Sequence, residues 1–102
     1  MALLFCGSVS AAPPWSSDTG KIATLFTTTA GAMAITLDGG YPHAVSEGQC
    51  PAANGFAGFA TADPSIKSAL LAAKAAGSTV TIITVGCAGG NAWFGLNQIY
   101  VN

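Results

Sequence analysis

Residues 63–77, DPSIKSALLAAKAAG, are the most strongly patterned segment of this sequence. Ile66, Leu70 and Ala73 recur at the three- and four-residue spacing that places side chains on one face of a helix. Asp63 suits the capping position before the helix, the proline after it suits the first turn, and the closing glycine suits the position after the last turn. The segment therefore predicts one amphipathic helix with defined ends.

Short segments rich in β-branched and aromatic residues lie on both sides of this helix, and turn-forming residues separate them. The segments expected to be strands are residues 21–28, 32–37, 55–61, 79–85 and 94–101. The first two are expected to form a hairpin, with one continuous bent strand as the alternative. In the first strand, alternation places Ile22, Thr24 and Phe26 on one face. Ile83 breaks the alternation of the fourth strand, which predicts that this strand is covered on both faces for part of its length.

Five short strands with a helix between the third and the fourth (β-β-β-α-β-β) follow the order of an oligonucleotide/oligosaccharide-binding (OB) barrel. The expected fold class is therefore mainly β with one helix, in an OB-fold-like five-stranded barrel. A chain of 102 residues has room for one such domain. We assign it to residues 21–102, and residues 12–20 are expected to be an exposed, turn-rich lead-in.

The first eleven residues, MALLFCGSVSA, are apolar and end in small residues, as a secretory signal peptide does before its cleavage site. Residues 1–11 are therefore expected to be a signal peptide, incomplete at its N-terminus because no positive charge precedes the apolar run. A structured N-terminal strand is the alternative. The signal predicts a periplasmic or secreted protein.

Three cysteines are present, and removal of residues 1–11 removes Cys6. The remaining two, Cys50 and Cys87, most simply form one disulfide in an exported protein. The chain-entropy model assigns roughly 4 kcal/mol of stabilisation to a bridge that closes a loop of this length. This pairing leaves no free thiol, so it is preferred over a role for Cys87 as a nucleophile.

Charge and hydropathy exclude two classes of partner. Only 7% of the residues are charged, the net charge is −1, and the three basic residues are lysines scattered along the chain. Nucleic acid is not an expected partner, because its binding requires a concentrated basic surface. No apolar run reaches the ~20 residues that cross a bilayer, so no integral membrane span is expected.

His43 is the only histidine, and for catalysis it would need a nucleophile and an orienting acid, for which Asp38 and Glu47 are the nearest candidates in the sequence. One histidine and two distant cysteines fall short of the four ligands of a structural zinc site. The glycines of residues 85–95 lack the spacing of a phosphate-binding loop. We therefore expect no catalytic residue, metal or cofactor, and no enzyme; the alternative is a small hydrolase that uses His43.

Aromatic and uncharged polar side chains occur in two irregular segments. The long loop before the third strand carries Tyr41 and His43, and the turn before the last strand carries Asn91 and Trp93. A sugar presents an apolar C–H face to an aromatic ring, while neighbouring polar groups bond its hydroxyls. Because the disulfide would bring the two segments together, these four residues are the expected ligand-binding site.

The C-terminal part of the chain, IKSALLAAKAAGSTVTIITVGCAGGNAWFGLNQIYV, resembles the C-terminal half of the B subunits of subtilase cytotoxin and pertussis-like AB5 toxins. It resembles still more the small exported OB-fold proteins related to them. The shared pattern is an Ala/Leu-rich helix, a short turn, a Val/Ile strand, a glycine-rich turn and a terminal strand. The resemblance implies a non-catalytic OB barrel that binds glycans and often forms a homo-oligomer, commonly a pentamer. No site residue is carried over from it, because the sugar-contacting serine of the toxin subunits has no assignable counterpart here.

The expected function is therefore carbohydrate recognition by an exported, non-enzymatic binding module. The alternative is a structural or inhibitory envelope or secreted protein that acts through protein–protein contacts. A ring of subunits in solution would favour the first hypothesis, and a monomer the second.

Overall fold

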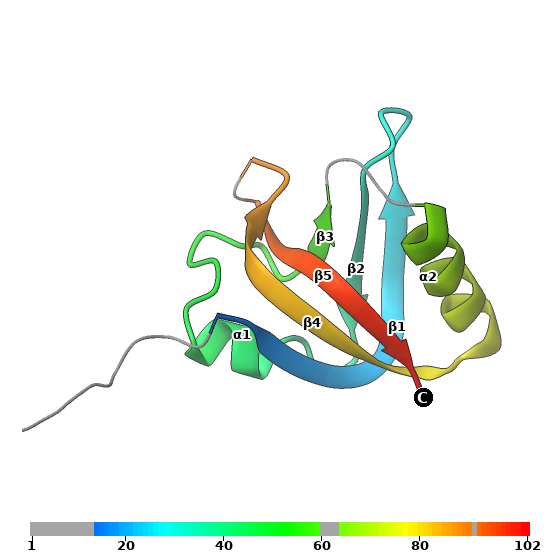
Figure 1. Ribbon diagram of the computed structural model, residues 1–102, viewed down its shortest axis with the longest axis horizontal. Coiled ribbons are helices and arrows are strands. Elements are labelled where there is room, and N and C mark those ends of the chain that lie inside the picture. The colour runs from blue at the N-terminus through cyan, green and yellow to red at the C-terminus, as the bar shows by residue number, and fades with distance from the viewer. Residues whose placement is uncertain (1–13, 60–63, 91) are drawn as a thin grey trace, which may run out of the picture.

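Five strands close into a barrel in the order β1-β2-β3-β5-β4 (Figure 1). The computed structural model describes residues 14–59, 64–90 and 92–102. Its strands are β1 (Ser16–Thr27), β2 (Met33–Leu37), β3 (Ala57–Phe59), β4 (Thr79–Ala88) and β5 (Trp93–Val101), and its helices are α1 (Pro42–Ser46) and α2 (Pro64–Ala76).

The closure of the barrel depends on the length of β1. Residues 16–21 of β1 pair with β4, and residues 22–27 pair with β2, both in antiparallel fashion. On the other side of the barrel, β3 runs parallel to β5, and β5 pairs antiparallel with β4. With α2 inserted between β3 and β4, this topology confirms the predicted OB-fold-like barrel. The antiparallel pairing of β1 with β2 also confirms the expected hairpin.

The apolar side chains that the sequence pattern assigned to α2 and β4 lie in the core of the barrel. Val80 and Ile82 of β4 are completely buried, and so is Leu70 of α2. Ala73 is buried beside Leu70, while Ile66 packs against the same core at its margin. The predicted apolar face of the helix is therefore the face that covers the barrel.

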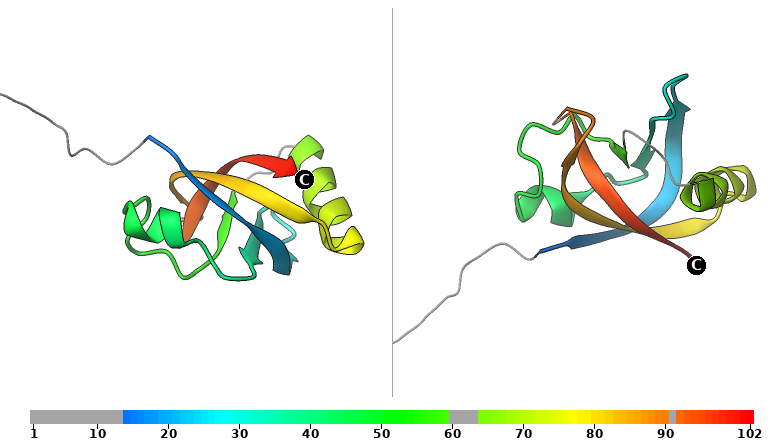
Figure 2. Two further views of the ribbon diagram at one scale, coloured as in Figure 1. Left: turned by 90° about the horizontal axis from the view of Figure 1, so that it is seen from below. Right: turned by 45° about the horizontal axis from the view of Figure 1, so that its top comes forward.

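The two helices lie on opposite sides of the barrel (Figures 1 and 2). The longer helix, α2, lies beside β1 and β5, and the short α1 lies near the start of β1. The sequence had predicted only loop for the residues of α1. Neither helix of the described residues is long and apolar enough to cross a membrane.

The predicted lead-in at residues 12–20 is wrong from Ser16 onward. β1 begins at Ser16, and the inward-facing Ser16 and Asp18 are 2% and 3% exposed. Burial of these polar side chains is tolerated because each has hydrogen-bond partners from α1 and the segment after it. Residues 12 and 13 lie outside the described residues, as does the whole of the predicted signal peptide, residues 1–11.

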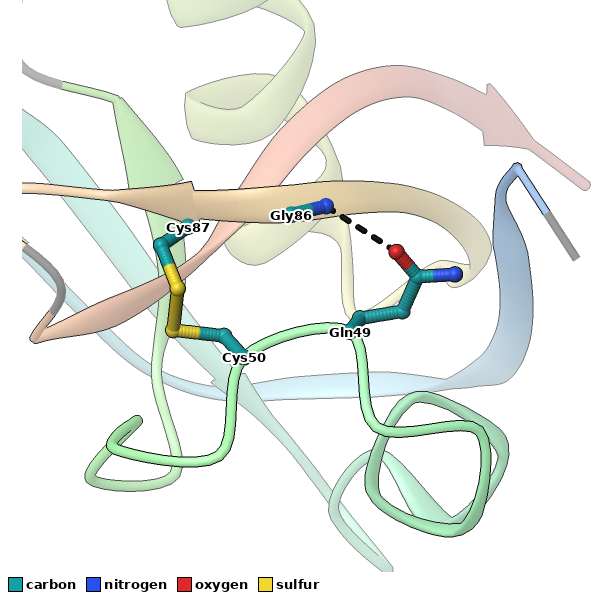
Figure 3. The surroundings of a disulfide bond; sticks show 4 residues. All are labelled: Gln49, Cys50, Gly86 and Cys87. Carbon is teal, nitrogen blue, oxygen red and sulfur yellow. Dashed lines mark hydrogen bonds between the residues drawn. A yellow bond between two sulfur atoms is a disulfide. The ribbon is translucent and has the colours of Figure 1, made fainter. Parts of the chain in front are cut away.

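A disulfide joins Cys50, in the segment after α1, to Cys87 of β4 (Figure 3), as the sequence predicted. The two cysteines are separated by 37 residues in the sequence. Cys50 is buried in the core, whereas Cys87 lies at the surface. The bridge therefore ties the irregular segment between α1 and β3 to the barrel wall.

Candidate functional site

A buried carboxylate connects β1 to the first turn of α1. Oδ1 of Asp18 accepts hydrogen bonds from the backbone N–H of His43 at 2.9 Å and from Nδ1 of the same histidine at 2.9 Å, and Oδ2 accepts from the backbone N–H of Ala44 at 3.1 Å. These N–H groups lie at the start of a helix, where no intrahelical acceptor is available. Asp18 thus caps α1 from a strand 25 residues earlier in the chain.

A second set of polar contacts continues from this cap to β4. The hydroxyl of Ser16 donates to Oε1 of Glu47, and Nε2 of Gln49 donates to the same hydroxyl oxygen at 3.1 Å. Oε1 of Gln49 accepts from the backbone N–H of Gly86 at 3.0 Å (Figure 3). Because Cys87 is the next residue, the hydrogen bond and the disulfide fix adjacent points of the same segment to β4.

His43 is held by its backbone and by one ring nitrogen, while 66% of its side chain is exposed. A carboxylate only accepts hydrogen bonds, so the Nδ1 that faces Asp18 carries the proton. An acid that orients a histidine in this way is also found at catalytic sites, where the other ring nitrogen activates a nucleophile. The orienting acid is neither Asp38 nor Glu47, the two that the sequence suggested.

The cysteine that the sequence offered as a nucleophile is unavailable, because Cys87 is bonded to Cys50. Within the described part of the chain, no group of three or more His, Cys, Asp or Glu side chains is arranged to hold a metal ion.

Tyr41 is buried and does not present its ring to a ligand, which corrects the assignment of this residue to the binding site. It is 3% exposed, its hydroxyl donates to the backbone oxygen of Ile35 at 2.8 Å, and its ring lies 5.7 Å from that of Phe94. Burial raises the pKa of Tyr41, and the negative charge of Asp18 raises it further. The residue contributes to the core beneath α1.

Trp93 belongs to an aromatic cluster on the barrel. Its ring lies edge-on to Phe26 with centroids 5.4 Å apart, and Phe26 makes the same kind of contact with Phe56 at 5.2 Å. The ring also covers Gly89 of the β4–β5 turn, where an added Cβ would lie 2.7 Å from a ring carbon. Trp93 lines none of the three hollows described below, whereas His43 lines one of them. The two residues therefore do not share a hollow. Asn91, the fourth residue of the predicted site, lies outside the described residues.

Aromatic and uncharged polar side chains, the residue types expected of a sugar-binding site, line a hollow on the outer face of β4 and β5. We call this hollow the Trp15 groove. It has a volume of about 280 Å³ and is lined by Trp15, Ile83, Val85, Asn97, Gln98 and Tyr100. Trp15 and Tyr100 are 53% and 55% exposed. The hydroxyl of Tyr100 donates to Oε1 of Gln98 at 3.2 Å. None of the described residues that line this groove is charged.

Ile83 forms the floor of the Trp15 groove. Its neighbour Ile82 faces the barrel interior, so Ile83 faces outward, yet it is only 9% exposed. The break in alternation at this position therefore has the predicted cause: β4 is covered on both faces here.

Two further hollows adjoin the Trp15 groove. One, of about 480 Å³, shares Trp15 with it and is lined also by Pro14, Ser16, Ser17, His43 and Glu47. The other, of about 300 Å³, shares Val85 and Asn97 with it and extends to Gly58 and Phe59 of β3 and to Cys87 and Ala88 of β4. Of the three predicted site residues that the structure describes, His43 is therefore the one that borders a hollow of this surface.

Sequence reasoning missed Trp15, Asn97, Gln98 and Tyr100. The exposure of Tyr100 could have been predicted from the alternation of the last strand, because alternation places Tyr100 on the face opposite Ile99. Trp15 gave no such signal, since its position follows only from the pairing of Ser16 with Thr84 in β4.

No protein-family model, curated protein or solved structure matches this chain. The geometry of the site is therefore the basis for the function proposed below.

Proposed function

We propose that this protein is an exported, non-enzymatic binding module that recognises neutral carbohydrate in the Trp15 groove. The observation that carries the proposal is the combination of two exposed aromatic rings, Trp15 and Tyr100, with the side-chain amides of Asn97 and Gln98. Aromatic faces pack on the apolar C–H faces of a sugar, and amides both donate to and accept from its hydroxyls.

The described residues that line the groove are all uncharged, which favours an uncharged ligand over an acidic or basic one. A charged ligand that lost water in this groove would find no opposite charge to offset the cost. The resemblance of residues 63–101 to glycan-binding toxin B subunits points to the same class of ligand.

The proposed export is supported by the Cys50–Cys87 disulfide. Disulfides persist in oxidising compartments and are rare in the cytosol of mesophiles. A periplasmic or secreted location fits this chemistry, and the apolar start of the sequence fits a signal peptide.

A glycan array that carries both neutral and charged glycans tests the proposal. Wild-type protein is expected to bind neutral glycans, and Trp15→Ala should weaken that binding about tenfold or more, which corresponds to a contact worth at least ~1.4 kcal/mol. Val101→Ala is the matched control, because Val101 is 52% exposed and lines none of the three hollows. A blank array with wild-type protein would contradict the proposal and favour the structural or inhibitory alternative.

A further inference from the structure

The three hollows on this side of the barrel share lining residues with one another. Trp15 borders both the Trp15 groove and the hollow beside His43, and Val85 with Asn97 borders both the Trp15 groove and the hollow beside β3. A surface of linked hollows differs from a single closed pocket, which would fit one terminal sugar.

Each residue that borders two hollows can contact parts of a ligand that lie in both of them. Trp15 is 53% exposed and Val85 is 42% exposed, so neither is needed to fill the core. A ring that borders two hollows can pack against consecutive units of one chain, and Asn97 can bond to units in both of the hollows that it borders.

The two outer hollows differ in chemistry. The described residues that line the hollow beside β3 are small or apolar, apart from Asn97, and none of them is charged. The hollow beside α1 contains the imidazole of His43 and the carboxylate of Glu47, and Asp18 fixes the orientation of His43. Among the described residues, ionisable side chains thus occur at one end of the linked surface, while its middle and its other end suit an uncharged chain.

From these shared borders we propose that the ligand is an extended, neutral oligosaccharide chain, bound across all three hollows, with Trp15 between the unit in the Trp15 groove and the unit in the hollow beside α1. This inference rests on the proposed function and narrows the ligand from carbohydrate in general to a linear chain. One unit of the chain lies on the Trp15 groove, and further units occupy the hollows on either side.

The test measures the dissociation constant as a function of ligand length, by calorimetry. The probes are cello-oligosaccharides, chito-oligosaccharides and any neutral linear glycan bound on the array, each as a series from the monosaccharide to the hexasaccharide. The dissociation constant is expected to fall by about tenfold or more from the monosaccharide to the trisaccharide and to level off once the three hollows are filled.

Two variants test whether sugar units of a long ligand occupy the two outer hollows. His43→Ala alters the hollow beside α1, and Ala88→Gln fills part of the hollow beside β3; both residues lie outside the Trp15 groove. Each variant should weaken binding of the long oligosaccharides severalfold and leave monosaccharide binding unchanged. Val101→Ala should leave the whole length series as in wild type.

The outcomes separate the two proposals. Equal affinity for short and long members of a bound series would overturn the extended-chain inference and leave carbohydrate binding intact. Loss of monosaccharide binding in His43→Ala or Ala88→Gln, in protein with a wild-type melting temperature, would also overturn it. Absence of binding to every glycan would overturn the proposed function as well.

Discussion

Asp18 and His43 are joined at two points: one carboxylate oxygen of Asp18 lies 2.9 Å from both the backbone nitrogen and Nδ1 of His43. The contact links the start of β1 to α1, the shorter of the two helices in the described part of the chain. A helix of five residues has little stability of its own, because helix nucleation is costly and short helices depend on tertiary contacts. The position of α1, and with it one wall of the hollow beside His43, therefore depends on Asp18.

Substitution Asp18→Ala should lower the free energy of unfolding by about 2–4 kcal/mol, because it leaves the N–H groups of His43 and Ala44 without their acceptor in a buried setting. Asp18→Asn, which keeps one acceptor oxygen, should cost less. Urea denaturation of the three proteins measures both effects. Equal stability of Asp18→Ala and wild type would show that this cap does not hold α1.

Loss of the disulfide should destabilise the barrel without changing its fold. The free energy of unfolding of the Cys50→Ala/Cys87→Ala double variant is expected to be about 2–4 kcal/mol lower than that of wild type. The reason is that the bridge joins residues 37 positions apart, so its loss gives the unfolded chain much more conformational freedom. Thermal melts of the double variant and of wild type, with and without reductant, measure the effect. Reductant should lower the melting temperature of wild type alone, and an equal response of both proteins would contradict the prediction.

Tyr41 should make the protein less stable at alkaline pH. Its pKa is raised in the folded state, so above the ordinary tyrosine value of about 10 the unfolded chain loses this proton while the folded chain keeps it. The stability contributed by the neutral phenol is complete below that pH and decreases above it by up to about 1.4 kcal/mol per pH unit.

Tyr41→Phe removes this titrating group, so its free energy of unfolding should fall less steeply than that of wild type above about pH 10. At neutral pH the variant should be about 1 kcal/mol less stable, because it lacks the hydrogen bond to Ile35. Urea denaturation across the alkaline range gives both quantities, with Tyr100→Phe, which removes an exposed phenol, as the matched control. Parallel pH profiles for Tyr41→Phe and wild type would argue against the predicted role of this buried hydroxyl.

Helix α2 and most of the strands could be predicted from the sequence because their patterns are local. Ile66, Leu70 and Ala73 repeat at helical spacing, and Val80 with Ile82 repeats at strand spacing; all of these pack on the core as expected. The disulfide followed from counting cysteines once an export signal was assumed.

The first strand shows where local pattern fails. Alternation placed Thr24 on the same face as Ile22, but a β-bulge between these residues shifts the register, so Ile22 is buried, Thr24 is exposed and Leu25 packs on the core. Ser16 and Asp18 read as a polar, exposed segment because the groups that satisfy them, from His43 to Gln49, come much later in the chain.

Tyr41 was wrongly assigned to the candidate site for a related reason. The long loop was expected to present Tyr41 to a ligand, yet its hydroxyl finds a partner inside the barrel and the ring turns inward. The exposed aromatic platform forms instead from Trp15 and Tyr100, which lie at nearly opposite ends of the sequence. Only the pairing of β4 with both β1 and β5 brings them to one surface.

The proposed site can be tested directly because the chain has two tryptophans, one in the Trp15 groove and one in the aromatic cluster with Phe26. Each indole N–H gives its own signal in a ¹H–¹⁵N NMR spectrum, assigned with Trp15→Phe and Trp93→Phe. On titration with a neutral oligosaccharide, the account predicts that the Trp15 indole signal and the side-chain amide signals of Asn97 and Gln98 shift, while the Trp93 indole signal stays in place. A shift of the Trp93 indole with no change at Trp15 would contradict it and would place the ligand at the β4–β5 turn.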